Sequence, residues 1–456
     1  MKLIRRVRNT FFVLLMMNIM LLNKLIIPMW MPFLGRVGIK LCTIIIIAVC
    51  FGIMEVLPCY ERGQRVRIQV LAGGYELIVT TFWALLIEVL GYGLLFNRYG
   101  YWIAQKEMMT NLLFINAIIA YLILLLHYLN GFWRTAFCSS QLGVRLRFWM
   151  LLFWSIFPIN IVLFVKWCAI VRRELIYERN QYLLDRARVE SAVCRTKYPV
   201  VMVHGIFFRD WQFLNYWGRI PKELKRNGAI VYYGHQQSSL SVAESAGELK
   251  EEVLRILENT GASKVNIVAH SKGGLDARYA ISKLGMEDYV ASLTTINTPH
   301  RGCEFVDRIL QKMPKCLINF VARRYNGIFK ALGDKEPDFL AGVRDLTAAS
   351  CKIFNETVPD SKKVYYQSIM SRMRNMRSAG FPLNFSYLLA RMYDGQNDGL
   401  VGVDSAVWGN FMGVISAGYK GISHGDMIDL THKNIKGFDV NEFYVQLFMG
   451  LAGKGF

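Results

Sequence analysis

One segment, Val265 to Arg278, restricts the possible folds of this chain more than any other. It begins with an apolar run, continues with Ala-His-Ser-Lys-Gly-Gly and ends in a helix-compatible stretch. This is the sequence form of a nucleophile elbow, a sharp turn that leaves a buried strand, exposes a serine and enters a helix. Ala269, a variant of the usual glycine, and Gly273 flank Ser271, because larger side chains would clash inside so tight a turn. The segment predicts that Ser271 is a nucleophile.

Two further blocks frame this elbow. Upstream, Tyr198 to Gly205 is an apolar run that ends in His-Gly, where one oxyanion donor is expected. Downstream, Val290 to Gly302 is an apolar run that ends in Asn-Thr-Pro-His-Arg-Gly. With these three blocks in this order, residues 198–456 resemble the bacterial triacylglycerol lipase and esterase family of α/β hydrolases. The resemblance implies an α/β-hydrolase fold, with a mostly parallel sheet flanked by helices, and cleavage of carboxylic esters.

Strand-like and helix-like segments alternate through the same region. The strand candidates are 199–204, 229–234, 264–269, 290–296 and 363–370, and the helices between them include 241–259 and 272–284. Strands separated by helices predict a parallel sheet covered on both faces. Ligand sites in such sheets lie at the carboxyl ends of the strands, where Ser271 falls.

A serine nucleophile needs a histidine base, and that imidazole needs a carboxylate to orient it. Of seven histidines, only His424 and His432 come late enough for the hydrolase order of Ser, Asp and His. The family places its base in a His-x-Asp context, which favours His424. Residues 396–401 match the family's Asn-Asp-Gly-Leu-Val, which indicates Asp398 as the acid, with Asp394 and Asp404 as competitors.

The resemblance also implies an oxyanion hole made by the backbone N–H groups of Ile206 and Lys272. The Lys272 ammonium either attracts anionic lipid head groups or is simply solvated, and we favour the second. Four aromatic residues near this corner either line an acyl pocket or pack in the core: Phe207, Phe208, Trp211 and Trp217. Residues 303–345 mix apolar and basic residues where related lipases carry lid helices, and a plain cap over the sheet is the alternative.

A structural calcium ion is common in the family, and Asp426 stands at a matching position two residues after His424. No Asp or Glu occurs between Asp360 and Asp394, where a partner carboxylate is expected. Calcium prefers several oxygen ligands, so the site lacks a full set. No organic cofactor is implied.

The first 170 residues differ in character from the rest. Apolar residues form 53% of the whole chain and are concentrated there. Stretches long enough to cross a bilayer lie near 39–58, 76–96, 110–130 and 148–171, with an interrupted fifth near 10–34. A cleaved signal peptide is the alternative for the N-terminal stretch near 10–34, but no small-x-small cleavage site follows it. We expect an all-α membrane region over 1–171 with four to five transmembrane helices, a connecting helix over 172–197 and a hydrolase domain over 198–456.

The net charge of +20 is spread over both regions, as expected of a protein at an anionic membrane surface. Nucleic acid is not an expected partner, because no recognition motif accompanies the charge, and no protein partner follows from the sequence. Arg172 and Arg173 after the last span, like the basic N-terminus, favour a cytoplasmic hydrolase domain, with a bacterial plasma membrane as the expected location. Four spans fit both cues, whereas five would place the hydrolase domain outside. Nine cysteines without C-x-x-C spacing argue against a disulfide framework.

These observations predict a membrane-anchored serine hydrolase that cleaves lipid esters through an acyl-enzyme, with lipid or another ester as substrate. Acyl transfer to an alcohol by the same serine is one alternative. A catalytically inactive membrane scaffold with a hydrolase fold is another, and transport by the apolar spans is a third.

Overall fold

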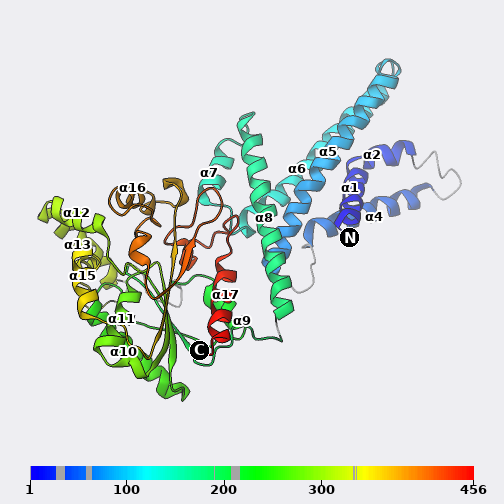
Figure 1. The fold of residues 1–456 in the computed structure, drawn as a ribbon. Coiled ribbons are helices and arrows are strands. Elements are labelled where there is room, and N and C mark those ends of the chain that lie inside the picture. Colours follow the sequence, from blue (N-terminus) through cyan, green and yellow to red (C-terminus); the bar gives the residue numbers. More distant parts are fainter. Residues whose placement is uncertain are drawn as a thin grey trace. The chain divides into compact units, whose positions relative to one another are not determined.

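The computed structural model describes residues 2–26, 36–57, 64–188, 190–206, 216–331, 334 and 336–456. It divides into two compact units, Met1–Leu184 and Asp185–Phe456. The first unit is helical, and the second contains a sheet with helices around it (Figure 1).

The second unit is built on six parallel strands in the order β2-β1-β3-β4-β5-β6. The strands are β1 (Val200–Val203), β2 (Val231–Tyr233), β3 (Val265–His270), β4 (Val290–Ile296), β5 (Tyr365–Ser371) and β6 (Asn410–Ile415). The five predicted strands correspond to β1 to β5. The prediction missed β6, an edge strand whose residues alternate between exposed and half-buried positions and include Gly413 at φ +112°.

Helices cover both faces of this sheet because its central strands are apolar on both sides. In β1, Val200 and Met202 pack in a core with helices α9 (Ile220–Arg226) and α17 (Val440–Gly453). Val201 and Val203 point the other way and pack with helices α10 (Val242–Thr260) and α11 (Gly273–Lys283). Figure 1 shows these two helix pairs on opposite sides of the strands. The predicted α/β-hydrolase fold is confirmed.

The other helices of this unit follow β4 and β5. They are α12 (Glu304–Lys312), α13 (Lys315–Ala331), α14 (Phe339–Asp345), α15 (Ala348–Thr357) and α16 (Leu383–Tyr393). Helices α12, α13 and α14 come from the segment for which a lid or cap was expected.

The first unit contains α1 (Lys2–Met17), α2 (Ile19–Leu21), α4 (Arg36–Val56), α5 (Val66–Ala104), α6 (Glu107–Cys138), α7 (Val144–Leu152) and α8 (Ile159–Arg188). Helices α5 and α6 approach closely at two glycines. A Cβ at Gly74 would lie 2.9 Å from the Gly131 carbonyl oxygen, and a Cβ at Gly131 would lie 2.9 Å from the Gly74 carbonyl oxygen. Small residues at a helix contact let the two backbones come this near.

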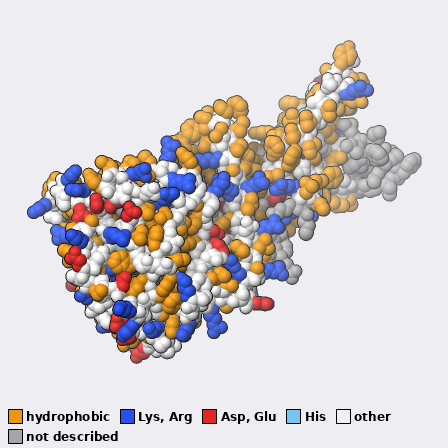
Figure 2. All heavy atoms as spheres, in the orientation of Figure 1, with side chains coloured by type: hydrophobic (Ala, Val, Ile, Leu, Met, Phe, Trp, Pro, Cys, Tyr) orange, Lys and Arg blue, Asp and Glu red, His pale blue; other side chains and the backbone are white. Residues whose placement is uncertain are grey.

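The count of four to five membrane spans is too high for the described residues. Of the helices in the described ranges, only α5 and α6 are long and apolar enough to cross a bilayer. The 148–171 stretch is divided between two helices: α7 ends at Leu152, and α8 begins at Ile159. Pro158 stands directly before α8, and a proline is tolerated at a helix start but not in a helix interior. The apolar part of α4 is the shorter segment Leu41–Val56, and part of the 10–34 stretch lies outside the described residues. Figure 2 shows hydrophobic side chains on the surface of this unit.

Candidate active site

Ser271 stands at the turn between β3 and α11, with the backbone conformation of an elbow. Its φ is +56°, which an L-residue other than glycine rarely adopts, and its N–H donates to the Ile296 carbonyl oxygen at 3.0 Å. A Cβ at Gly273 would lie 2.4 Å from the His204 carbonyl oxygen, and one at Gly274 would lie 2.2 Å from Thr298 Oγ1. The small residues after the serine are therefore required by the approach of neighbouring strand ends.

The structure brings His424 and Asp398 together as a buried pair. His424 Nδ1 lies 2.7 Å from Asp398 Oδ2, and the His424 N–H donates to the Asp398 carbonyl oxygen at 2.9 Å. Asp398 Oδ1 accepts from the N–H groups of Leu400 and Val401 at 2.9 and 2.8 Å. These donors stabilise the carboxylate in its charged form and hold it toward the imidazole.

Asn297 also binds the Asp398 carboxylate, and no role was predicted for it from the sequence. It follows β4 at φ +50°, and its Nδ2 donates to Asp398 Oδ2 at 2.6 Å and to Ser371 Oγ at 2.8 Å. Its Oδ1 accepts from the Ser371 N–H at 2.9 Å. The signal in the sequence was an asparagine directly after a buried apolar run, at the carboxyl edge of the sheet.

His424 packs against His270, the residue directly before Ser271. The rings of His424 and His270 lie 4.4 Å apart. Within the described part of the chain, no hydrogen bond joins the Ser271 hydroxyl to His424; such contacts often tighten only when substrate binds. Burial and the nearby His424 lower the pKa of His270 well below its ordinary value. The His270 ring is therefore neutral beside His424, and its Nδ1 lies 2.7 Å from the Tyr216 hydroxyl.

The two expected oxyanion donors lie at the same edge. Neither the Ile206 N–H nor the Lys272 N–H donates to another described residue. Gly205 precedes Ile206, and a Cβ there would lie 2.8 Å from the Ser271 Cβ. The loop before Ile206 thus depends on glycine to come this close to the nucleophile.

The expectation of a solvated Lys272 side chain is wrong. The ammonium is buried and lies 2.8 Å from both Asp276 Oδ1 and Ser245 Oγ. Burial raises the pKa of Asp276 to about 7, and the lysine opposes that rise. Helix spacing brings residues 272 and 276 together, and Ser245 on α10 provides the third polar group. The buried ammonium is therefore not exposed to lipid head groups.

An apolar pocket of about 210 Å³ opens beside Ser271. Its lining comes from the oxyanion loop, α12, α14 and the acid loop, and consists of Ile206, Ser271, Pro299, Cys303, Phe305, Val306, Ile309, Leu310, Phe339, Val343, Leu346, Leu400 and Val401. Trp217 is not among these residues and is fully buried in the core beside α17. Phe207, Phe208 and Trp211 lie outside the described residues.

The alternative candidates for the base and the acid have other surroundings. His432 is exposed. Asp394 accepts from the N–H groups of Glu304 and Phe305 at 2.8 and 3.1 Å, so it caps α12. Asp404 begins a short 3-10 turn, away from the pair formed by the histidine and Asp398.

A calcium ion does not fit the residues around Asp426. The Asp426 carboxylate accepts from the Ser423 N–H and hydroxyl at 2.9 and 2.7 Å. The neighbouring Asp429 is bound by the Arg219 guanidinium at 2.7 and 2.8 Å. In the part of the chain that the structure describes, no group of three His, Cys, Asp or Glu side chains is arranged to hold a metal.

Comparisons with known proteins find similar sequences among lipases and thioesterases. Residues 199–337 match the palmitoyl protein thioesterase family model. The chain is 36% identical over 179 residues to a triacylglycerol lipase of Pseudarthrobacter phenanthrenivorans, covering 36% of this chain and 55% of that protein. It is 29% identical over 261 residues to triacylglycerol lipase 2 of Saccharomyces cerevisiae, covering 53% of this chain and 75% of that protein.

Two solved structures are similar to this chain at lower sequence identity. A metagenomic carboxyl esterase has a TM-score of 0.45 and 15% identity over 58% of this chain and 77% of its own. A Bacillus licheniformis lipase in its mature form has a TM-score of 0.42 and 21% identity over 56% of this chain and 92% of its own.

The chain therefore has an α/β-hydrolase fold, and part of its sequence is similar to triacylglycerol lipases. The chain spans about half the length of the first curated relatives that it matches, at 55% and 49%.

Proposed function

We propose that this protein is a membrane-anchored serine hydrolase that cleaves carboxylic esters of lipids through an acyl-enzyme. The observation that carries the proposal is the His424–Asp398 pair, buried beside a serine in elbow geometry at an apolar pocket. A buried, hydrogen-bonded imidazole next to a hydroxyl in strained backbone is the arrangement that activates a serine.

In the proposed reaction, Ser271 Oγ attacks the ester carbonyl carbon while His424 Nε2 takes the hydroxyl proton. Asp398 accepts a hydrogen bond from Nδ1 and stabilises the imidazolium that forms. The N–H groups of Ile206 and Lys272 stabilise the oxyanion, a contribution of about 3 to 4 kcal/mol for one donor. His424 then gives its proton to the leaving alcohol. Water repeats the sequence on the acyl-enzyme and releases the acid.

The apolar pocket supports a fatty acyl chain as the part of the substrate that binds beside the serine. Its lining is apolar apart from the serine itself and one buried cysteine, Cys303. Burial raises the pKa of the Cys303 thiol well above its ordinary value, so that sulfur is not a competing nucleophile.

Exposure of apolar side chains supports the proposed membrane anchor. A core helix of a soluble protein is mostly buried, but only 22% of the most apolar stretch of α5 and 33% of that of α6 is buried within the chain. The exposed residues include Leu90, Leu94, Phe114 and Leu122. We infer that α5 and α6 form a hairpin in the bilayer, that the hydrolase domain lies on the cytoplasmic side, and that α12 to α14 act as a lid.

The test is covalent labelling of the purified full chain by a fluorophosphonate in detergent micelles. We expect the wild type to be labelled and Ser271→Ala to be unlabelled. Ser263→Ala, which changes an exposed serine before β3, is the matched control and should label normally. An unlabelled wild type with an intact melting transition would support the inactive scaffold instead.

Acyl transfer is distinguished from hydrolysis by the products, and thioester cleavage from ester cleavage by the substrate. The family model over residues 199–337 favours including a thioester among the substrates. Matched oxygen and thiol esters of one acyl chain should be supplied with and without an added acceptor alcohol. Free fatty acid as the main product in the presence of the alcohol supports hydrolysis, and a new ester as the main product supports transfer.

A further inference from the structure

One exposed surface of the hydrolase unit combines an apolar ridge with unpaired basic groups. The ridge is formed by Phe381, Phe385, Leu388 and Met392, which are 86%, 61%, 43% and 72% exposed. Phe385, Leu388 and Met392 are spaced by three and four positions along α16, so they lie on one face of the helix, and Phe381 lies two residues before the helix begins. We call this ridge and the cations beside it the α16 surface.

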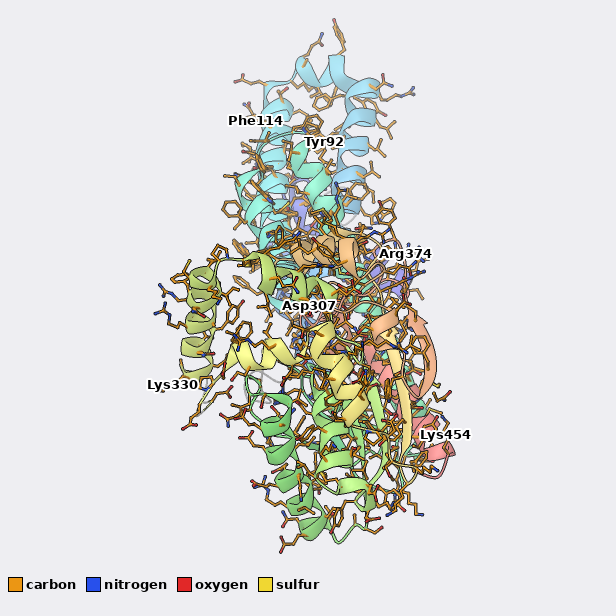
Figure 3. The ribbon with its side chains drawn as sticks, turned by 60° about the vertical axis from the view of Figure 1, so that its left-hand side comes forward. Tyr92, Phe114, Asp307, Lys330, Arg374 and Lys454 are labelled. Carbon is orange, nitrogen blue, oxygen red and sulfur yellow. The ribbon has the colours of Figure 1, made fainter. Side chains whose placement is uncertain are left out.

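The cations beside the ridge are Arg374, Arg377, Arg391 and Lys420, all exposed. Among the described residues, none of them forms an ion pair with a carboxylate. The sequence from 361 to 393 contains basic residues but no acidic ones. Arg374, labelled in Figure 3, and Arg391 line an open hollow of about 520 Å³ together with apolar atoms of Met376, Leu388 and Met392.

We propose that the α16 surface docks onto a bilayer that contains anionic phospholipids. A ridge of large apolar side chains bordered by cations is the pattern of an interfacial helix, with its apolar face at the acyl boundary and its basic groups at the head groups. The hollow between Arg374 and Arg391 provides two cations for one lipid phosphate. Charge complementarity selects an anionic bilayer over a neutral one, because among the described residues none of the four cations is paired with a carboxylate.

The proposed contact lies next to the acid loop of the active site. Helix α16 ends at Tyr393, five residues before Asp398, and Asn397 Nδ2 donates to the Tyr387 carbonyl oxygen at 3.4 Å. A docked α16 would therefore hold the loop that carries the acid close to the lipid. The inference concerns binding, and it does not depend on catalysis by Ser271.

The experiment is hydrogen–deuterium exchange of the full chain in nanodiscs, with zwitterionic lipid alone or with part of it replaced by anionic lipid. Peptides from 374–393 should exchange more slowly in the anionic discs. Each basic side chain near an anionic surface favours docking about fivefold, so Arg374→Gln with Arg391→Gln should weaken docking about 30-fold. The lipid-dependent protection should disappear in that double variant, and also in ~1 M salt, where charges are screened beyond about 3 Å.

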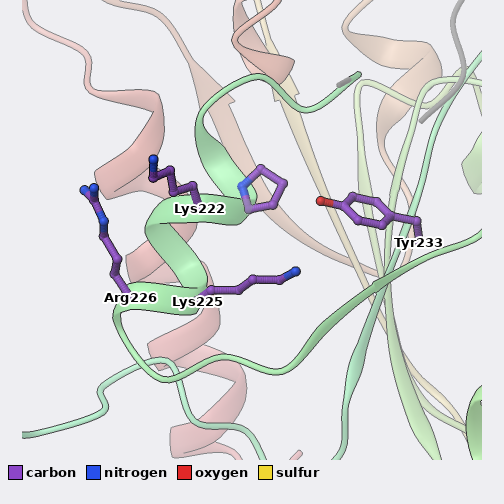
Figure 4. Close-up of a pocket in the computed structure, with 5 residues that line it drawn as sticks. Lys222, Lys225, Arg226 and Tyr233 are labelled. Atoms are coloured by element: carbon purple, nitrogen blue, oxygen red, sulfur yellow. The ribbon is translucent and has the colours of Figure 1, made fainter. Parts of the chain in front are cut away.

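A second basic hollow provides the control. It has a similar volume, about 490 Å³, and is lined by Pro221, Lys222, Lys225, Arg226 and Tyr233, as Figure 4 shows. Lys222→Gln with Lys225→Gln removes the same charge but leaves the α16 surface unchanged, so protection of 374–393 should persist.

Three results overturn the proposal. Equal loss of protection in both double variants, or no difference between lipids, means that no specific docking occurs. Protection already complete in detergent micelles and unchanged by Arg374→Gln with Arg391→Gln means that another part of the chain covers the surface. Fluorophosphonate labelling is measured in parallel, so failure of docking and failure of catalysis are separate outcomes.

Discussion

Asn297→Asp tests whether the support of Asp398 controls the reactivity of Ser271. The change keeps the size of the side chain, and aspartate tolerates the positive φ of this position almost as well as asparagine. It replaces the N–H donor 2.6 Å from Asp398 Oδ2 with a second carboxylate. Two carboxylates this close share a proton near neutral pH, so Asp398 can no longer remain fully charged beside His424.

The expected loss follows from the hydrogen bond that is removed. A hydrogen bond to a charged group is worth about 1.5 to 3 kcal/mol, which corresponds to about a 10- to 150-fold slower reaction if all of it acts in the transition state. The assay is the second-order rate constant for fluorophosphonate labelling. Stability should also fall as pH rises from about 4 to 7, because repulsion raises the folded pKa of the new carboxyl above its unfolded value.

Ser371→Ala is the matched control. It removes the hydroxyl that accepts from Asn297 Nδ2 at 2.8 Å but leaves the bond to Asp398 in place. Only a neutral hydrogen bond is lost, so labelling should slow by less than about fivefold. If Asn297→Asp labels as fast as Ser371→Ala, Asn297 does not govern the acid and the reasoning is refuted.

Three further predictions follow from the same unit. Lys272→Met leaves Asp276, whose pKa is already raised to about 7, buried without its cation, so the pKa of Asp276 should rise further. Thermal melts should then show a stability loss that grows as pH increases above about 4, the pKa of this carboxyl in the unfolded chain. Adding Asp276→Asn to the variant should remove this pH dependence. Gly205→Ala places a Cβ 2.8 Å from the Ser271 Cβ, so labelling should be lost while the circular dichroism spectrum is kept. Val306→Trp fills the pocket beside the serine, so the ratio of long-chain to acetyl ester hydrolysis should fall, and an unchanged ratio would contradict the acyl-chain assignment.

Local patterns were enough to predict the sheet and the elbow. Buried parallel strands are continuous apolar runs, so β1, β3 and β4 are visible in the sequence. Strand β6 was missed because an edge strand that alternates between exposed and half-buried residues resembles a polar loop. The 148–171 stretch was misjudged because composition alone does not show where a proline divides an apolar run.

The sequence by itself determined which residue types stand in chain order Ser, Asp and His, since chain order and local turn chemistry need no long-range information. Only the tertiary structure decided what surrounds them. Asn297 meets Asp398 across 101 positions of the chain, and Lys272 finds Ser245 on a different helix. These contacts depend on how strand ends and helices converge, and a buried polar group takes whichever partner that convergence provides.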